Sequence, residues 1–466
     1  MIVMKFGGTS TQDAAAMANV AGIVQNHLAR KPVVVISAIA QATNELEQIG
    51  KLAAEGSENQ AHGVLENLFS RHYAIVDELI KDRQRHQELR KTISAYLGEL
   101  ETLIKGVAIL RELTPRTLDR FYSFGELLSS LIVSYVFREK GVDAIWLDTK
   151  DFMITDDSFN RALPMMEMVS ERLASAARPA MEAGKVLVTQ GFLGVTQQGE
   201  RTTMGRESSD YSAAVIGAVL GAEDVQIWTD VDGVLTADPR VVPNPRKVKV
   251  LSFDEAYELS YFGAKVLHPN TMLPALERSI PIHVFNSRRP NLSGTLITSA
   301  SNDSQAMVKS IAFRASITIL TVSPLRRLSP YIFWEHIYSV LTKHRLVPRM
   351  SATSEYKIAV ALDANSNLGS AVRDLAEIGR VEAITGKGIV CVVGQNIRNS
   401  PGLVSRIFSI LAERAIEMIS YGGSASNVGF VVDENLIPEV VRRLHAEFFD
   451  AIGDSETFEV LGHLGT

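Results

Sequence analysis

The chain has 466 residues, of which 46% are hydrophobic and 21% are charged, and its formal net charge is −6. This length allows two to four domains, each with an adequate core. The negative net charge and the lack of dense Lys/Arg runs argue against a nucleic-acid partner. A single cysteine, Cys391, excludes an intramolecular disulfide and a cysteine-based zinc site. Its apolar neighbours predict a core residue.

The N-terminus carries no sign of a targeting segment. It reaches Gly7-Gly8 too early for a signal peptide, and no apolar run approaches the ~20 residues that span a bilayer. The sequence therefore predicts a cytoplasmic protein without a membrane partner.

Short apolar runs alternate with helix-like segments over residues 1–298. Runs rich in Val and Ile predict strands at 2–6, 33–37, 144–147, 186–192, 225–229 and 282–285. Strands that are apolar on both faces are typical of a sheet covered by helices. The pattern predicts one layered α/β domain, 1–298, with a largely parallel sheet. The charged, proline-free stretch 44–112 predicts several helices inserted over one end of the sheet.

The remaining chain repeats itself at an offset of about 70 residues. Four pairs of segments carry the repeat: 317–322 with 389–393, 333–341 with 403–411, 358–362 with 428–432, and 370–378 with 439–449. They predict two copies of β-α-β-β-α-β, at 308–384 and 385–466, and leave open whether the C-terminal strand returns to the first copy. Such repeats are usually ligand-sensing or pairing modules, and a purely structural duplication is the alternative.

Lys5-Phe-Gly-Gly-Thr-Ser10 directly follows the first predicted strand. Glycines at this place let backbone N–H groups approach phosphate oxygens, and a following helix N-terminus favours anions. Lys5 suits the charge on a transferring phosphoryl group. The alternative is a purely structural glycine turn. The chain contains neither a P-loop nor the signatures of a protein kinase.

The segment 229–240 places three aspartates and one arginine around a glycine turn. It begins where a predicted strand ends, and ligands bind at such ends in open α/β sheets. Arg240 offers a planar fork for phosphate, and the nearby carboxylates suit Mg²⁺. The alternative is a solvated Asp-rich turn.

Two further segments place charges at predicted helix starts. Arg206-Glu-Ser-Ser-Asp210 precedes a small-residue run at 212–220 that predicts a helix. Arg206 and the helix N-terminus suit an anionic substrate, and Asp210 suits an ammonium group. The alternative is that Ser209 or Asp210 caps the helix. Glu126 is expected near the start of another helix, either to complement the helix dipole or to bind an ammonium group.

Taken together, these segments resemble the aspartokinases of the amino-acid kinase superfamily, and the repeat resembles their tandem ACT domains. The matching segments occur in the family's order: 5–10, 37 with 43–44, 124–126, 205–210, 229–240 and 261–269. The resemblance implies an α/β amino-acid kinase fold followed by two ACT-like modules. It also implies phosphoryl transfer from MgATP to the β-carboxylate of L-aspartate, on the route to lysine, threonine and methionine.

The resemblance also implies a role for individual residues. Lys5 and Asp210 are expected to be catalytic. ATP is expected to bind Lys5, Gly7, Gly8, Thr229, Asp230, Arg240 and Lys265. Aspartate is expected to bind Ser37, Thr43, Glu126, Arg206 and Ser209. An amino-acid effector is expected near Ser354 and Glu355. Mg²⁺ is expected to enter with ATP, and no residue is assigned as a direct metal ligand.

The chemistry of the implied reaction agrees with these residue types. A carboxylate acceptor with a pKa of ~3.9 is ionised at pH 7 and needs no general base. The obstacle is the repulsion between two anions, which calls for cations and positioning. His268 is therefore interpreted as packing or capping. The rivals are another amino-acid kinase, such as a glutamate or acetylglutamate kinase, and a silent amino-acid sensor.

Two departures from the family bear on these expectations. Glu207-Ser208 stands where the family usually has Gly-Gly, so that loop lacks the backbone freedom of glycine. Arg349 stands where lysine-sensing relatives carry an acidic residue, and its charge would repel an ammonium side chain. Because ACT modules generally pair edge to edge, we expect a homodimer, with a tetramer as the alternative.

Overall fold

The structure is a computed structural model that describes residues 1–205, 208–264, 267, 269–299, 307–325, 329–365 and 367–461. It divides into two compact units, Met1–Gly233 with Leu267–Ala300 and Val234–Val266 with Ser301–Thr466. The division falls inside the segment 229–240. Thr229 and Asp230 therefore belong to the first unit, and Arg240 belongs to the second.

The first unit is built on a sheet whose strands follow the order β3-β4-β2-β1-β7-β10-β11. Neighbouring strands from β3 to β10 are parallel, and β11 is antiparallel to β10. The largely parallel sheet expected from the sequence is thus confirmed. The bounds are β1 Ile2–Phe6, β2 Pro32–Ile36, β3 Ala144–Leu147, β4 Val186–Gln190, β7 Asp224–Thr229, β10 Ile282–Asn286 and β11 Thr295–Thr298.

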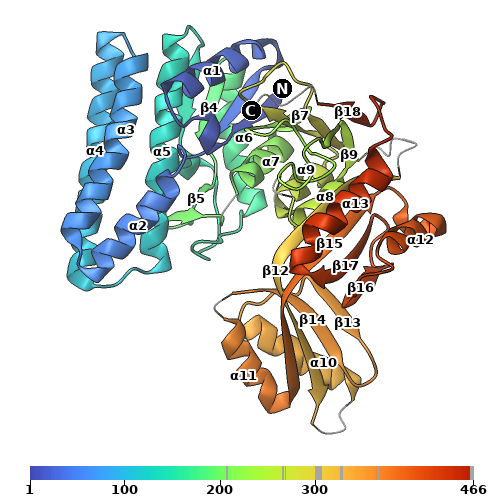
Figure 1. The fold of residues 1–466 in the computed structure, drawn as a ribbon. Coiled ribbons are helices and arrows are strands. Elements are labelled where there is room, and N and C mark those ends of the chain that lie inside the picture. The colour runs from blue at the N-terminus through green and yellow to red at the C-terminus, as the bar shows by residue number, and fades with distance from the viewer. Residues whose placement is uncertain are drawn as a thin grey trace. The chain divides into compact units, whose positions relative to one another are not determined.

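Helices cover this sheet, and the expected insertion forms part of them (Figure 1). Their bounds are α1 Ala14–Gln25, α2 Ala42–Glu55, α3 Glu58–Leu79, α4 Arg83–Leu110, α5 Pro115–Glu139, α6 Met166–Glu182, α7 Ser209–Leu220 and α9 Leu273–Glu277. The α5 helix contacts β2, β3 and β4, whereas α2, α3 and α4 pack on α5 and on one another. The insertion therefore widens the helical layer. The expectation that it covers one end of the sheet was wrong. None of the described helices is long and apolar enough to cross a membrane.

The second unit contains a sheet of order β13-β14-β12-β15-β17-β16. The elements of both predicted copies are present in the predicted order, and Cys391 is fully buried as expected. Figure 1 shows α10 and α11 beside the β12–β14 half of this sheet. The bounds are β12 Val308–Pro324, α10 Pro330–Lys343, β13 Met350–Thr353, β14 Ile358–Asp363, α11 Leu368–Ile378, β15 Gly379–Gly394, α12 Pro401–Ile410, β16 Met418–Tyr421, β17 Asn427–Asp433 and α13 Ile437–Phe449.

The two copies share the long strands β12 and β15. The second half of β12 pairs with β14, whereas its first half lies beside the part of β15 that pairs with β17. A register shift between Arg314 and Ile317 marks the change of partner. The predicted boundary between residues 384 and 385 lies inside β15, and the division into two separate modules stays a prediction.

The segment 234–266 packs within the second unit. It forms β8 Arg246–Val248, β9 Val250–Ser252 and α8 Phe253–Tyr261, which contacts β12 and β15. A capping box between Ser252 and Glu255 starts α8. The C-terminal strand β18, Phe458–Val460, pairs antiparallel with β8. It therefore does not return to the first copy.

Candidate functional site

The glycine turn after β1 lies against the loop that follows β2. The Gly7 N–H donates to the Trp228 carbonyl at 3.1 Å, and the Ala40 N–H donates to the Gly8 carbonyl at 3.1 Å. A Cβ atom at Gly8 would lie 2.8 Å from the Ala38 carbonyl oxygen, so a side chain at this position would force the two loops apart. The close approach explains why the first motif needs glycine here.

Lys5 and Asp210 meet beside this turn. The Lys5 Nζ lies 2.7 Å from the Asp210 Oδ1, and the two side chains are 12% and 14% exposed. Asp210 lies in the first turn of α7, whose N-cap is Ser208 without a side-chain hydrogen bond. The alternative that Ser209 or Asp210 caps this helix is therefore wrong. The two residues predicted to be catalytic come from distant segments and form one ion pair.

Glu126 lies in the middle of α5 and not near a helix start, so the predicted position was wrong. Thr114 caps the helix and Pro115 begins it, well before Glu126. The Glu126 Oε1 accepts from the Ala38 N–H at 3.1 Å, whereas its Oε2 is buried without a partner among the described residues. Burial raises the pKa of Glu126 to about 8, although the Ala38 hydrogen bond and the Lys5 charge oppose this shift.

Gly125 allows α5 to approach the loop after β2. A Cβ atom at Gly125 would lie 2.8 Å from the Ala38 Cβ. One turn later, the Ser129 hydroxyl donates to the Ser37 carbonyl at 2.7 Å. The motif 124–126 thus has a physical meaning, because the glycine brings the helix close enough for Glu126 to bond the Ala38 N–H.

A cavity of about 510 Å³ opens at this place, and we call it the α5 pocket. Residues with predicted roles that line it are Gly8, Ser37, Thr43, Glu126 and Ser209. They come from the glycine turn, the β2–α2 connection, α5 and the start of α7. The remaining lining residues are Ala38, Ile39, Ala40, Gln41, Asn44, Leu118, Tyr122, Asn160, Phe192, Thr203 and Gly205. Four residues predicted to bind aspartate therefore share one cavity.

Sequence reasoning missed two residues that line the α5 pocket. Asn160 and Phe192 line it with positive φ angles of 67° and 64°, which side-chain-bearing residues rarely adopt. The Phe192 ring packs edge-on against Tyr122 at a centroid distance of 6.0 Å. Such backbone outliers cluster at functional sites, but a single sequence gives no signal for them.

The end of β7 is connected to the glycine turn by two serines. The Thr229 carbonyl accepts from the Ser287 N–H at 2.8 Å, and the Ser10 hydroxyl donates to the Ser287 Oγ at 2.8 Å. Asp232 is buried, accepts from the Asn286 Nδ2 at 2.6 Å and pairs with Arg289. Asp232 is therefore used inside the fold, which the pattern of the segment 229–240 did not reveal.

Asp230 and Arg240 of this segment are exposed. Asp230 follows β7 and accepts from the Thr229 hydroxyl at 3.3 Å. Arg240, in the second unit, is 75% exposed, and its Nε lies 3.0 Å from the Asp238 Oδ1. Its guanidinium fork is thus held by a carboxylate in this structure, and phosphate would have to replace that carboxylate. The roles of Asp230 and Arg240 stay predictions.

Several predicted residues cannot be compared with the fold. Arg206, Lys265 and His268 lie outside the described residues, so their roles stay predictions. Ser354 and Glu355 are exposed in the turn between β13 and β14, where the Ser354 N–H donates to the Lys357 carbonyl at 2.8 Å. Among the described residues, no group of three or more His, Cys, Asp or Glu side chains gathers in a way that suits a metal ion.

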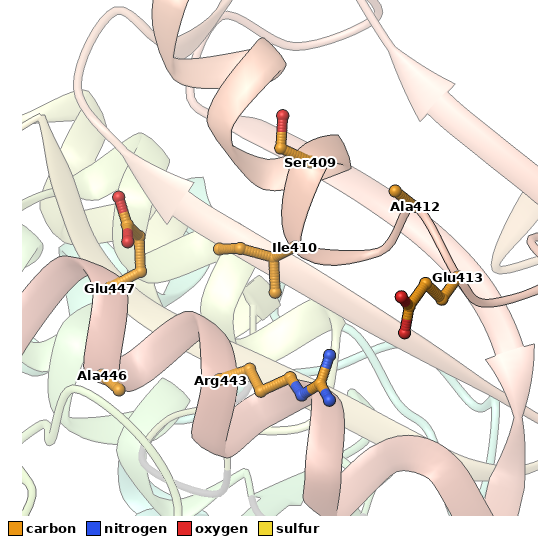
Figure 2. Close-up of a pocket in the computed structure, with 7 residues that line it drawn as sticks. All are labelled: Ser409, Ile410, Ala412, Glu413, Arg443, Ala446 and Glu447. Atoms are coloured by element: carbon orange, nitrogen blue, oxygen red, sulfur yellow. The ribbon is translucent and has the colours of Figure 1, made fainter.

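A second hollow, of about 610 Å³, lies between α12 and α13 (Figure 2). Its lining includes Ser409, Glu413, Arg443 and Glu447. Figure 2 shows the side chains of Glu413 and Arg443 pointing into the same space. None of the residues with a predicted role lines this hollow.

Comparisons with known proteins agree with the fold. The amino acid kinase family matches residues 1–286, and an ACT domain matches residues 390–448. Lysine-sensitive aspartokinase 3 of Escherichia coli (strain K12) is 33% identical over 97% of this chain and 99% of its own length.

Two crystal structures of E. coli aspartokinase III also match, and each covers 97% of this chain and 100% of its own. The complex with aspartate and ADP (R-state) has a TM-score of 0.86 at 34% identity. The complex with lysine and aspartate (T-state) has a TM-score of 0.80 at 33% identity. Fold and sequence define a member of the amino acid kinase family with a C-terminal ACT domain. Within that family the chain belongs to the aspartokinases, which are ATP-dependent phosphotransferases.

Proposed function

We propose that the enzyme transfers the γ-phosphoryl group of MgATP to the β-carboxylate of L-aspartate and forms 4-phospho-L-aspartate. The observation that carries this proposal is the α5 pocket, which gathers Gly8, Ser37, Thr43, Glu126 and Ser209 from distant segments. Asp210, which pairs with Lys5, directly follows the pocket residue Ser209 on α7. The relative crystallised with aspartate and ADP supports the same pair of substrates.

The transfer step needs positive charge more than it needs a base. A carboxylate oxygen of aspartate forms a bond to the γ-phosphorus, the bond to the β–γ bridging oxygen breaks, and ADP leaves with the electron pair. Lys5 would hold the phosphoryl oxygens as their charge develops. Asp210 would fix the position of the Lys5 ammonium group, since the two atoms already lie 2.7 Å apart.

Glu126 would recognise the ammonium group of the acceptor. Its buried Oε2 has no partner among the described residues, and an unsatisfied buried polar atom is costly until a partner arrives. Ser37, Thr43 and Ser209 offer hydroxyl groups to the carboxylates of aspartate. Arg206 would add a bidentate contact to one of them.

The nucleotide would lie along the glycine turn and the segment after β7. Backbone N–H groups near Gly7 and Gly8 would face the phosphates, with Thr229 and Asp230 beside them. Arg240 and Lys265 complete the predicted set. Mg²⁺ would be bound through the phosphates and would spread their negative charge.

An acceptor screen tests the proposal. Purified enzyme with MgATP and hydroxylamine is expected to form a hydroxamate with L-aspartate, and not with L-glutamate or N-acetyl-L-glutamate. A preference for either glutamate compound would favour another amino-acid kinase. Absence of ATP turnover with all three acceptors would favour a silent sensor.

We further propose that an amino acid regulates the enzyme at the ACT-like repeats, near Ser354 and Glu355. A relative was crystallised with lysine, but here Arg349 disfavours a cationic side chain. Both Arg314 and Arg349 pair with the same carboxylate, Asp363, so this cluster carries a net positive charge. A thermal-shift panel of lysine, threonine and methionine tests this, and strong stabilisation and inhibition by lysine would contradict it.

We also propose that the enzyme is a homodimer assembled through the repeats. The strands β13 and β16 form the two edges of the second sheet, and most of their side chains are exposed. Unpaired edges of this kind suit pairing with a second chain. Light scattering after size-exclusion chromatography is expected to give about twice 51.0 kDa. A monomer would contradict the proposal, and a tetramer would extend it.

A further inference from the structure

Asp119 is a buried carboxylate that lies behind the α5 pocket. It is 0% exposed and lies near the start of α5. Its Oδ2 accepts from the Asn160 N–H at 2.9 Å and from the Thr203 N–H at 3.0 Å. Its Oδ1 accepts from the Thr203 hydroxyl at 2.5 Å. One side chain thus bonds two segments that are distant in sequence.

The two partners of Asp119 form one wall of the α5 pocket. Asn160 lies in the loop before α6, and Thr203 ends the strand β6, Arg201–Thr203. The Ala162 N–H donates to the Thr203 carbonyl at 2.9 Å, so the loop and the strand also bond each other. Asn160 holds a φ angle of 67°, in the left-handed region that residues with a side chain rarely adopt. The Asp119 hydrogen bond stabilises this backbone.

Asp119 and Glu126 lie on the same face of α5. They are seven residues apart, which corresponds to about two helical turns. Glu126 bonds the loop after β2 through the Ala38 N–H, and Asp119 bonds Asn160 and Thr203 of the same lining. One helix therefore bonds two separate parts of the pocket lining, and their spacing depends on both carboxylates.

The hydrogen bonds of Asp119 come from neutral donors. Burial raises the pKa of its carboxyl, and the hydrogen bonds from Thr203 and Asn160 oppose that shift. A buried carboxylate is costly, and it persists only where its oxygens are well bonded. An apolar side chain at this position would instead leave the Asn160 and Thr203 N–H groups without their acceptor.

We infer that Asp119 is a positioning residue that sets the geometry of the acceptor wall formed by Asn160 and Thr203. It acts on acceptor affinity and does not act on the nucleotide. The inference rests on the proposed function, because it takes the α5 pocket as the aspartate site. Asp119 does not line the pocket, so it acts through its two partners.

The test compares Asp119→Ala with Asp119→Asn. The Ala variant removes all three hydrogen bonds. The Asn variant retains them, because its carbonyl accepts from both N–H groups and its amide donates to the Thr203 hydroxyl once that hydroxyl turns. The matched control is Asp224→Ala. Asp224 is 3% exposed and bonds His283 at 2.7 Å, but it begins β7, at the strand end opposite Thr229.

Asp119→Ala is expected to raise the KM for aspartate at least tenfold and to change the KM for ATP less than twofold. Asp119→Asn is expected to return the KM for aspartate to within about threefold of the wild type. Asp224→Ala is expected to lower the melting temperature without changing either KM. An unchanged KM for aspartate in a folded Asp119→Ala enzyme would overturn the inference, as would equal rises in both KM values.

Two further measurements distinguish a failure of this inference from a failure of folding or of the proposed function. If Asp119→Ala does not fold, Asp119→Ser retains one acceptor oxygen, and its KM for aspartate is expected to rise in the same direction. An unchanged value in that variant would also overturn the inference. Wild-type enzyme that forms no aspartyl hydroxamate would contradict the proposed function itself. Active wild type with an unaffected Asp119→Ala variant would contradict only the role of Asp119.

Discussion

Thr236 and His445 share a buried hydrogen bond of 2.9 Å between Oγ1 and Nε2. His445 lies on α13 of the second repeat, and Thr236 lies four residues before Arg240. The Thr236 Oγ1 also accepts from the Arg246 N–H at 2.8 Å, so its own proton is available for Nε2. The segment that carries a predicted ATP-binding residue is therefore bonded directly to an ACT-like repeat, within one compact unit.

Loss of this bond is expected to loosen the segment before Arg240. His445→Phe keeps an aromatic ring beside Phe449 but removes the acceptor. We expect a threefold to tenfold rise in the KM for ATP, because a buried hydrogen bond contributes ~1 kcal/mol. The KM for aspartate should not change. Thr236→Val should act in the same direction, and the double variant should be no worse than either single one. Additive effects would show that the two residues act separately.

Lys5→Met is expected to lower kcat by a factor of about 10² to 10³ and to leave the fold intact. The reason is that a positioned positive group stabilises the charge that develops on the phosphoryl oxygens. Steady-state kinetics and circular dichroism give the two readouts. Lys51→Met is the matched control, because Lys51 is exposed and pairs with Glu47 within α2. Turnover near the wild-type rate in Lys5→Met would remove the catalytic assignment.

Aspartate binding is expected to release a proton from Glu126. The buried carboxyl has a pKa raised to about 8, so it is mostly protonated in the free enzyme at pH 7. An ammonium group beside it favours the ionised form. Calorimetric titrations in buffers of different ionisation enthalpy should show close to one proton released per aspartate at pH 7, and almost none at pH 9.

Glu126→Gln supplies the control for this proton release. The amide keeps the shape of the side chain and does not titrate. The variant should bind aspartate more weakly and should release no proton. Identical proton release in the variant and the wild type would assign the titration to another group.

His72 is expected to make the folded state sensitive to acid. It is fully buried in α3, and burial lowers its pKa from 6.5 to about 4. A lowered histidine pKa stabilises the fold above pH 6.5, and that stability is lost as the pH falls from 6.5 towards 4. The loss amounts to at most ~3 kcal/mol for a shift of this size.

Denaturant unfolding at several pH values tests this expectation. His72→Leu should flatten the fall in the free energy of unfolding between pH 6.5 and pH 4. The more exposed His62 lies on the same helix, so His62→Leu is the matched control and should leave the slope unchanged. A wild-type slope in His72→Leu would show that other groups control acid unfolding.

The sequence predicted residues of the α5 pocket in those short motifs where the backbone geometry requires a particular residue type. Gly8 and Gly125 are needed for close approaches, and Gly8 and Glu126 from their motifs line the α5 pocket. The predicted start of the helix that carries Glu126 was too late in the sequence, although Thr114-Pro115 is a typical helix start. Asp119 gave no signal at all, because an aspartate in an amphipathic helix is ordinary until its distant partners are known.

The segment 229–240 shows the same limit of prediction from sequence. Its carboxylates suit Mg²⁺ by residue type, but the structure gives two of them other partners. Asp232 bonds Asn286 and Arg289, and Asp238 bonds Arg240. These partners, apart from Arg240, lie outside the motif or are set by loop geometry, so composition alone could not assign them.

The continuity of β12 and β15 has a practical consequence for protein engineering. A truncation at residue 384 would cut through β15 and would strip the first half of β12 of its neighbour. The newly exposed edge would then carry apolar side chains such as Val308 and Ile311, and the fragment would tend to aggregate. Variants that abolish the proposed amino-acid regulation are therefore better sought through point substitutions than by deleting a single repeat.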